Sequence, residues 1–203
     1  GYTILFVQPQ TQALRQAQMV RQIETAKPAP APEKLRSRAE VLAGSPRLHF
    51  DNGEIFGSIA LIGGRVDDLS LHHYFETREK ADPVVLFSPQ GSEYPRFAEF
   101  GWVGAAEKNL FLPGPKTLWR VAGNDKLTPT APVTLRWENG RGLSFTRIFS
   151  IDESFLITIT DQVTNASGAS VALHPFGLIA QVGLPAHLQN VWVVHEGPIG
   201  FIE

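Results

Sequence analysis

Residues 57–77, GSIALIGGRVDDLSLHHYFET, decide the fold of this chain. Residues 58–62 form a β-branched, apolar run that is typical of a buried strand. The pair Gly63 and Gly64 then predicts a turn, because residues without a Cβ atom adopt positive φ angles at no steric cost. Beyond the turn, residues 69–74 alternate between two faces, which predicts a second strand and therefore a β-hairpin.

The second strand of this hairpin contains a break in its alternation. Val66 is out of phase with the face that carries Leu69 and Leu71. A β-bulge at Asp67 and Asp68 restores the phase, because a bulge adds one residue to one strand only. We interpret the two aspartates as a solvated turn or bulge pair rather than as functional groups.

Three further runs alternate with the period of a β-strand, namely residues 133–138, 143–151 and 155–163. Short polar turns join them, which predicts an antiparallel meander with one apolar, buried face and one polar, solvated face. The dipeptide Asn-Gly at 139–140 favours a type I′ turn, although Arg-Gly at 141–142 also allows a longer loop. The apolar face of the second run also carries Arg147.

Other strands are predicted at residues 84–87, 119–121 and 191–194. Residues 171–173 and 176–182 are more uniformly apolar, which predicts a strand that is buried on both faces. No helical period competes after residue 47. The fold class is therefore all-β, and we predict a large antiparallel β-sandwich, although these patterns alone also allow a barrel.

The overall composition suits one soluble globular domain, since 203 residues with 43% hydrophobic content can bury a sizeable core. A net charge of -2 argues against a nucleic-acid-binding protein, which would need a clustered basic face. The absence of cysteine excludes thiolate catalysis, disulfides and zinc–thiolate sites, and leaves the redox compartment open.

Four stretches carry a resemblance to a known family: residues 57–77, the PVVLFSP run at 83–89, AEFGW at 98–102 and VHEGPIG at 194–200. In this order they resemble the large periplasmic domain of the YidC/Oxa family of membrane protein insertases. None of these stretches is a catalytic motif. The residues that carry the resemblance are expected to be structural, and they are Gly63, Gly64, Asp67, Asp68, Phe100, Gly101, Trp102, Glu196 and Gly197.

The resemblance implies a β-supersandwich related to galactose mutarotase-like folds, in the periplasm of a Gram-negative bacterium. It implies that the full protein is anchored in the inner membrane, where it inserts and folds membrane proteins alone or with the Sec translocon. Implied partners are the Sec translocon, the SecDF accessory proteins and nascent membrane proteins. The family domain continues with further strands, so an exposed sheet edge is expected near the C-terminal side of this chain, which would be incomplete there.

The N-terminal part is expected to lie outside the β-sandwich, which we predict to span residues 47–203. The apolar stub at residues 1–7 is too short to span a bilayer. The resemblance makes it the end of the first transmembrane helix, whereas its composition also allows a frayed tail. Residues 8–46 are predicted to be a flexible linker with weak helices, one of them at 33–42, and a Pro-Ala tract at 27–32.

No constellation for catalysis, metal or cofactor binding stands out, so we expect neither an enzyme nor a cofactor. The six histidines show no His-x-His or His-x-x-x-His spacing that would indicate a metal site. His72 and His73 are adjacent and point to opposite faces of a regular strand. His195 and Glu196 likewise cannot both face one cleft as the acid and base of a mutarotase.

Three functions remain open from the sequence. We favour a non-enzymatic interaction module of the insertase family. The alternative is a carbohydrate-binding module or aldose epimerase, with a cleft formed by Trp119, Trp137, Trp192 and His195, although the tryptophans fit a core better. A concave cleft that brings a histidine and a carboxylate together would favour that alternative. A third reading is a structural spacer.

Overall fold

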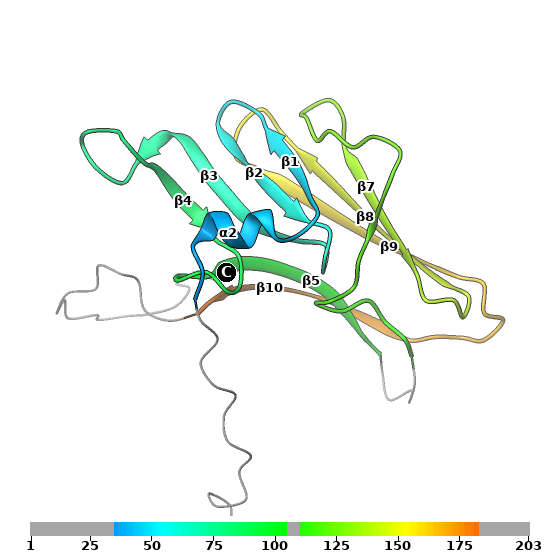
Figure 1. Cartoon of the computed structure of the whole chain (residues 1–203). Coiled ribbons are helices and arrows are strands. Elements are labelled where there is room, and N and C mark those ends of the chain that lie inside the picture. The colour runs from blue at the N-terminus through cyan, green and yellow to red at the C-terminus, as the bar shows by residue number, and fades with distance from the viewer. Residues whose placement is uncertain (1–34, 105–109, 183–203) are drawn as a thin grey trace, which may run out of the picture. The chain divides into compact units, whose positions relative to one another are not determined.

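In the computed structural model, residues 35–104 and 110–182 are described, and they form one helix and ten strands (Figure 1). The elements in chain order are α2 (Arg38–Ala43), β1 (Arg47–Asp51), β2 (Ile55–Ala60), β3 (Arg65–Phe75), β4 (Pro83–Phe87), β5 (Arg96–Gly104), β6 (Arg120–Ala122), β7 (Val133–Glu138), β8 (Leu143–Ile151), β9 (Ile157–Asn165) and β10 (Leu173–Gln181).

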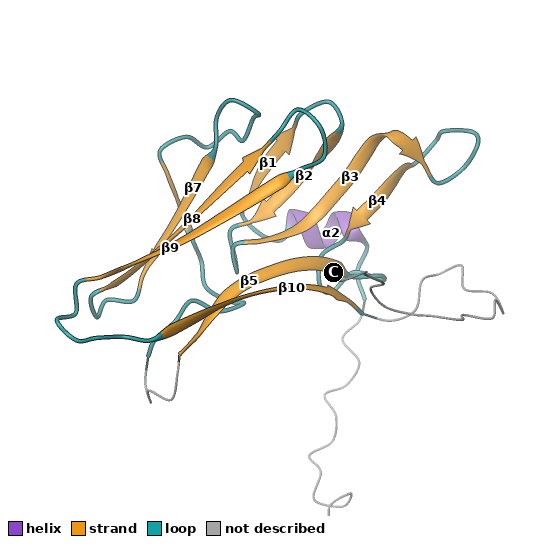
Figure 2. Ribbon diagram, turned by 180° about the vertical axis from the view of Figure 1, so that it is seen from behind, coloured by secondary structure: helices purple, strands orange, loops and turns teal. Residues whose placement is uncertain are grey.

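The strands form two antiparallel sheets (Figure 2). The first has the order β1-β2-β3-β5-β10, and the second has the order β6-β7-β8-β9. Strand β2 pairs with one edge of β3. On the other edge, β5 pairs with β3 at Val66, and β4 pairs with it between Leu69 and Phe75. The predicted antiparallel, all-β architecture is confirmed.

In the described part of the chain, one hydrophobic core receives side chains from both sheets. Trp102 of β5 lies against Phe145 of β8, with ring centroids 4.9 Å apart. Ile59 and Val66 of the first sheet and Leu135 of the second are also part of this core. Contact between the inner faces of two sheets is the defining feature of a sandwich, so the sandwich is confirmed over a barrel.

The hairpin at residues 57–77 has the predicted turn and the predicted bulge. Gly63 and Gly64 have φ angles of +83° and +59° between β2 and β3. Ser58 pairs with Asp68, whereas the next residue, Ile59, pairs with Val66. Asp67 is therefore the extra residue of the bulge.

The interpretation of the two aspartates as solvated is wrong. Asp67 and Asp68 are only 5% and 6% exposed. Their side chains form ion pairs with Arg38 of α2 and Arg47 of β1, which come from outside the hairpin. A local sequence pattern does not show which distant segment will cover a bulge.

The meander agrees closely with the prediction. Strands β7 and β8 have the predicted bounds, and β9 is displaced by two residues toward the C-terminus. The longer of the two loops predicted after β7 is present, since β7 ends at Glu138 and β8 begins at Leu143. The Asn139 side chain stabilises this loop by accepting hydrogen bonds from the backbone N–H groups of Arg141 and Leu143. The burial pattern of β8 alternates throughout.

The prediction of burial on both faces is wrong for β10. This strand is an edge strand in the described part of the chain, and Leu178 and Ile179 are 43% and 73% exposed. Its third residue, Pro175, is paired with Trp102 and has no N–H to donate, which an edge strand tolerates. An apolar run shows only that a strand can be buried, because burial needs a second layer above it.

The helix α2 lies within the segment predicted to be a linker. Ser37 and Glu40 form a capping box, in which each side chain accepts a hydrogen bond from the backbone N–H of the other residue. Among the described residues, no helix has the length and apolar character needed to cross a membrane. The predictions for residues 1–34 and for the strand at 191–194 lie outside the described residues.

Candidate functional site

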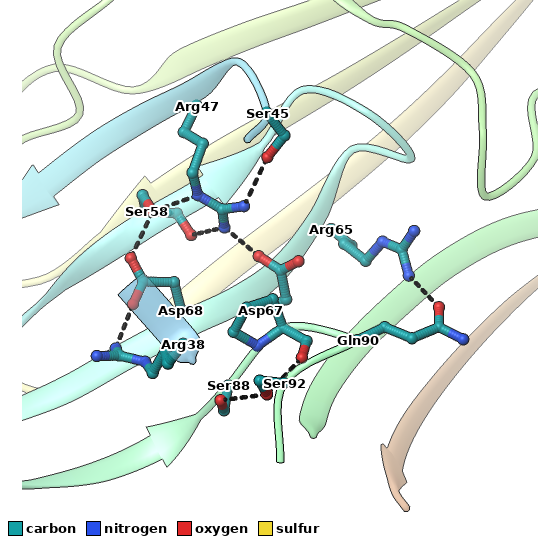
Figure 3. Close-up of polar contacts among 11 residues, drawn as sticks. Arg38, Ser45, Arg47, Ser58, Arg65, Asp67, Asp68, Ser88, Gln90 and Ser92 are labelled. Atoms are coloured by element: carbon teal, nitrogen blue, oxygen red, sulfur yellow. Dashed lines mark hydrogen bonds and ion pairs between the residues drawn. The ribbon is translucent and has the colours of Figure 1, made fainter. Parts of the chain in front are cut away.

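A cluster of buried and half-buried charged side chains lies on the outer face of the first sheet (Figure 3). Asp68 of β3 forms an ion pair with Arg38 of α2, and Asp67 forms one with Arg47 of β1. The Ser58 hydroxyl donates to Asp68. The two bulge carboxylates are thus held by three different elements besides their own strand.

Arg47 connects the two halves of this cluster. Its Nε donates to the Ser58 Oγ at 2.7 Å, and its Nη1 donates to the Ser45 Oγ at 3.3 Å. Arg38 also donates from Nη2 to the Ser70 Oγ at 3.2 Å. Arg38 of α2 and Ser45, which follows α2, therefore attach this part of the chain to the sheet.

Burial governs the electrostatics of the bulge. Loss of hydration raises the pKa of the Asp67 carboxyl, and the charges of Arg47 and Arg65 oppose this effect only in part. Such a displaced pKa also occurs at catalytic carboxylates. Here the carboxylate already contacts a guanidinium, so we assign it a structural role.

A second buried charge, Arg147 of β8, lies between the two sheets and is completely buried. Its guanidinium donates to both carboxylate oxygens of Asp161, at 2.7 and 2.9 Å, and to the carbonyl oxygen of Gly64 at 2.8 Å. The ring centroids of Trp102 and Trp119 each lie 5.2 Å from its central carbon. Aromatic faces attract a desolvated cation, so these contacts join β8 to the first sheet.

Five of the residues that carry the family resemblance lie near this arginine, namely Gly63, Gly64, Phe100, Gly101 and Trp102. A cavity of about 170 Å³ next to it is lined by Gly63, Glu99, Phe100, Gly101, Trp102, Pro113, Gly114, Pro115, Trp119 and Phe176. Most of the signature residues in the described part of the chain thus lie at the joint between the sheets or at the bulge. Glu196 and Gly197 lie outside the described residues.

The predicted tryptophan cleft is not assembled from the residues that the structure describes. Trp119 is 2% exposed and belongs to the core. Trp137 is half-buried and packs between Phe111 and Phe145 with tilted rings, at centroid distances of 5.4 and 5.7 Å. Trp192 and His195 lie outside the described residues.

One histidine does lie beside a carboxylate. His72 Nε2 and Asp51 Oδ1 are 3.0 Å apart, next to a groove of about 470 Å³ that is lined by Arg38, Leu42, His49, Phe50, Asp51, Phe56, Gly57, Asp68, Lys126, Leu127 and Thr128. An epimerase places its acid and base on either side of a sugar ring. A direct hydrogen bond between the two groups leaves no room for that ring, so the pair does not favour epimerase chemistry. Within residues 35–104 and 110–182, no three potential ligands converge on a metal site.

The sequence patterns identified Arg147 on an apolar face but missed its partner. Asp161 lies directly opposite Arg147 in the β8–β9 pairing. It also falls on the face of residues 155–163 that carries Ile157 and Ile159. Two opposite charges on the apolar faces of neighbouring strands were therefore a signal for a buried ion pair. The partners of the bulge, Arg38 and Arg47, gave no such signal.

Comparison with known proteins identifies consistent relatives. The family model of the YidC periplasmic domain matches residues 47–203. The chain is 45% identical over 168 residues to "Membrane protein insertase YidC" of Bradyrhizobium diazoefficiens. This alignment covers 82% of the chain and 27% of that protein. It is 41% identical, in an alignment of 223 positions, to the protein of the same name from Beijerinckia indica. That alignment covers 100% of the chain and 37% of the relative. The chain thus spans about a quarter to a third of the length of these relatives.

Proposed function

Because this chain belongs to the family of YidC periplasmic domains, we propose that it is a non-enzymatic interaction domain of a membrane protein insertase. Membership of this family makes the chain a periplasmic domain of an inner-membrane protein. The activity we propose for the whole protein is insertion and folding of inner-membrane proteins, alone or with the Sec translocon. The contribution of this domain would be contact with the Sec translocon, the SecDF accessory proteins or nascent membrane proteins.

The family match over residues 47–203 is the observation that carries this proposal. The ion pairs of three carboxylates support the non-enzymatic part of the proposal. Asp67, Asp68 and Asp161 each bind an arginine that is committed to holding elements together. Catalysis by general acid and base needs a group that is free to exchange a proton with a substrate. In the described part of the chain, these three carboxylates are not free in that way.

Photo-crosslinking of the full-length protein in cells tests the interaction role. Probes placed at exposed positions of residues 57–77 and 133–163, such as His73, Arg136 and Gln162, report on neighbours within a few ångströms. We expect light-dependent adducts with Sec accessory subunits or with nascent membrane proteins. Unirradiated cells provide the control.

Two other results would contradict the proposal. The absence of protein adducts at every position, together with sugar-dependent shifts in a titration, would favour a carbohydrate-binding module. The absence of both signals would favour a spacer. In that case, deletion of residues 47–203 from the full protein would leave growth unchanged.

A further inference from the structure

Three segments far apart in the sequence meet at one end of the described structure, where the β1–β2 and β8–β9 turns lie next to each other in Figures 1 and 2. The Asn52 side chain donates to the carbonyl oxygens of Asp152 and Ser154, both at 2.8 Å. The backbone N–H of His72 donates to the carbonyl oxygen of Glu54 at 2.9 Å, which brings the end of β3 to the same place.

The centre of this surface is apolar and exposed. Tyr74, Phe155 and Leu156 are 55%, 51% and 62% exposed. The rings of Tyr74 and Phe155 meet edge to face, with centroids 6.5 Å apart. Neighbouring apolar side chains that remain in water are characteristic of interaction surfaces rather than of ordinary protein surface.

The rim of this surface is acidic. The two turns and the last residue of β1 together carry four carboxylates, and residues 51–54, 71–75 and 152–156 contain no lysine or arginine. These four negative charges exceed the net charge of the whole chain, which is only -2, so negative charge is concentrated at this surface. The loop at 76–82, which follows β3, adds three acids and two bases. The four carboxylates of the rim are Asp51, Glu54, Asp152 and Glu153.

The surface is also held in one shape before any partner binds. The Asp152 carboxylate accepts hydrogen bonds from the backbone N–H groups of Ser154 and Leu156, at 2.9 and 3.0 Å. Asp51 accepts one from the backbone N–H of Gly53 at 2.9 Å, which is the main cause of its lowered pKa and keeps it charged. Preorganisation of this kind reduces the entropy that is lost on binding.

We propose that this surface, formed by Tyr74, Phe155 and Leu156 with the acidic residues Asp51, Glu54, Asp152 and Glu153, docks a basic protein segment in which apolar side chains are flanked by arginine or lysine. Guanidinium groups bind carboxylates with two hydrogen bonds and stack on aromatic rings, and the surface offers both kinds of group. The same charge repels an anionic membrane surface, so a protein segment fits better than a lipid surface. This inference rests on the proposed interaction role and gives it a location and a partner chemistry.

Binding of a defined peptide to the 203-residue chain tests the charge requirement. The probe is a short fluorescent peptide in which lysines flank a central Trp-Leu pair. We expect the double substitution Glu54→Gln with Glu153→Gln to weaken binding about three- to tenfold, since each exposed ion pair contributes modestly. The matched control, Glu93→Gln with Glu138→Gln, removes two exposed acids elsewhere and should change binding less than about twofold.

The apolar centre is tested separately. Phe155→Ser should weaken binding of the same peptide more than Val103→Ser, which removes an equally exposed apolar side chain on β5. Equal effects of the two acid pairs, or no binding of the lysine peptide at all, would overturn the inference. So would binding to phosphatidylcholine vesicles that requires Phe155 but not the acidic rim.

Crosslinking in cells separates the failure of this inference from the failure of the proposed function. Probes at Tyr74 and Leu156 of the full-length protein should capture protein, and the captured segments should be basic. Adducts at Arg136 or Gln162 with none at Tyr74 or Leu156 would overturn this surface and leave the interaction role standing. The absence of adducts at all four positions would overturn both.

Discussion

Arg147 is a charged side chain placed entirely inside the sandwich. It binds Asp161 through two hydrogen bonds and donates a third to the carbonyl oxygen of Gly64. The ion pair and the hydrogen bonds offset part of the cost of taking this charge out of water, whereas removal of one partner leaves the other charge without compensation. Loss of Arg147 should therefore destabilise the fold mainly because Asp161 and the Gly64 carbonyl would lose their hydrogen-bond donor.

Arg147→Ala should lower the free energy of unfolding by about 3–5 kcal/mol, because Asp161 would lose its partner and the aromatic rings would border a cavity. Arg147→Lys keeps the charge but cannot satisfy every acceptor, and should cost about 1–3 kcal/mol. Urea denaturation provides the measurement. The exposed Arg136→Ala on neighbouring β7 should change stability by less than about 0.5 kcal/mol. Similar values for Arg147→Ala and Arg136→Ala would refute the structural role.

The turn between β2 and β3 combines a positive φ angle with close packing. A Cβ atom added to Gly64 would lie 3.0 Å from the Trp119 Nε1 and 3.1 Å from its Cδ1. Gly140, in the β7–β8 loop, also has a positive φ angle, but a Cβ atom there would meet nothing within 4 Å. The two glycines thus share the backbone requirement and differ in packing.

Gly64→Ala should destabilise the chain by about 2–4 kcal/mol, from backbone strain together with displacement of the indole. Gly140→Ala should cost only the strain, about 1–2 kcal/mol. Thermal unfolding of both variants measures the difference. A smaller loss for Gly64→Ala than for Gly140→Ala would show that Trp119 does not restrict this turn.

The stability of the whole molecule should depend on pH through carboxylates of opposite behaviour. Burial raises the pKa of Asp67, so the folded state holds its proton more tightly than the unfolded state does. The contribution of Asp67 is therefore complete below about pH 4 and is lost as pH rises through the raised pKa. The advantage of the native sequence over Asp67→Asn should consequently shrink as pH rises above about 4 in urea titrations.

Asp51 supplies the control of opposite sign. The backbone N–H of Gly53 lowers its pKa, so its contribution is present above about pH 4 and is lost as pH falls through the lowered pKa. The advantage over Asp51→Asn should therefore shrink toward acid. If the Asp67→Asn difference also shrank toward acid, the ion pair with Arg47 would outweigh the loss of hydration at Asp67, and the raised pKa would be refuted.

The sequence by itself determined the strands and the interruptions between them. Alternation over residues 143–151, the glycine pair at 63–64 and the phase break at Val66 each reflect side-chain direction or backbone sterics within a few residues. Such local causes can be read without knowledge of the neighbours. This is why the turn, the bulge and the bounds of β7 and β8 agree with the structure.

Only the tertiary structure decided what covers these elements and which side chains meet. Arg38 binds Asp68 across 30 residues of sequence, Arg147 and the Gly64 carbonyl are 83 residues apart, and Tyr74 meets Phe155 across a similar separation. The exposure of β10 likewise depends on which layer lies above it. Burial and charge pairing are properties of segments brought together from distant parts of the chain, and a local pattern does not record that meeting.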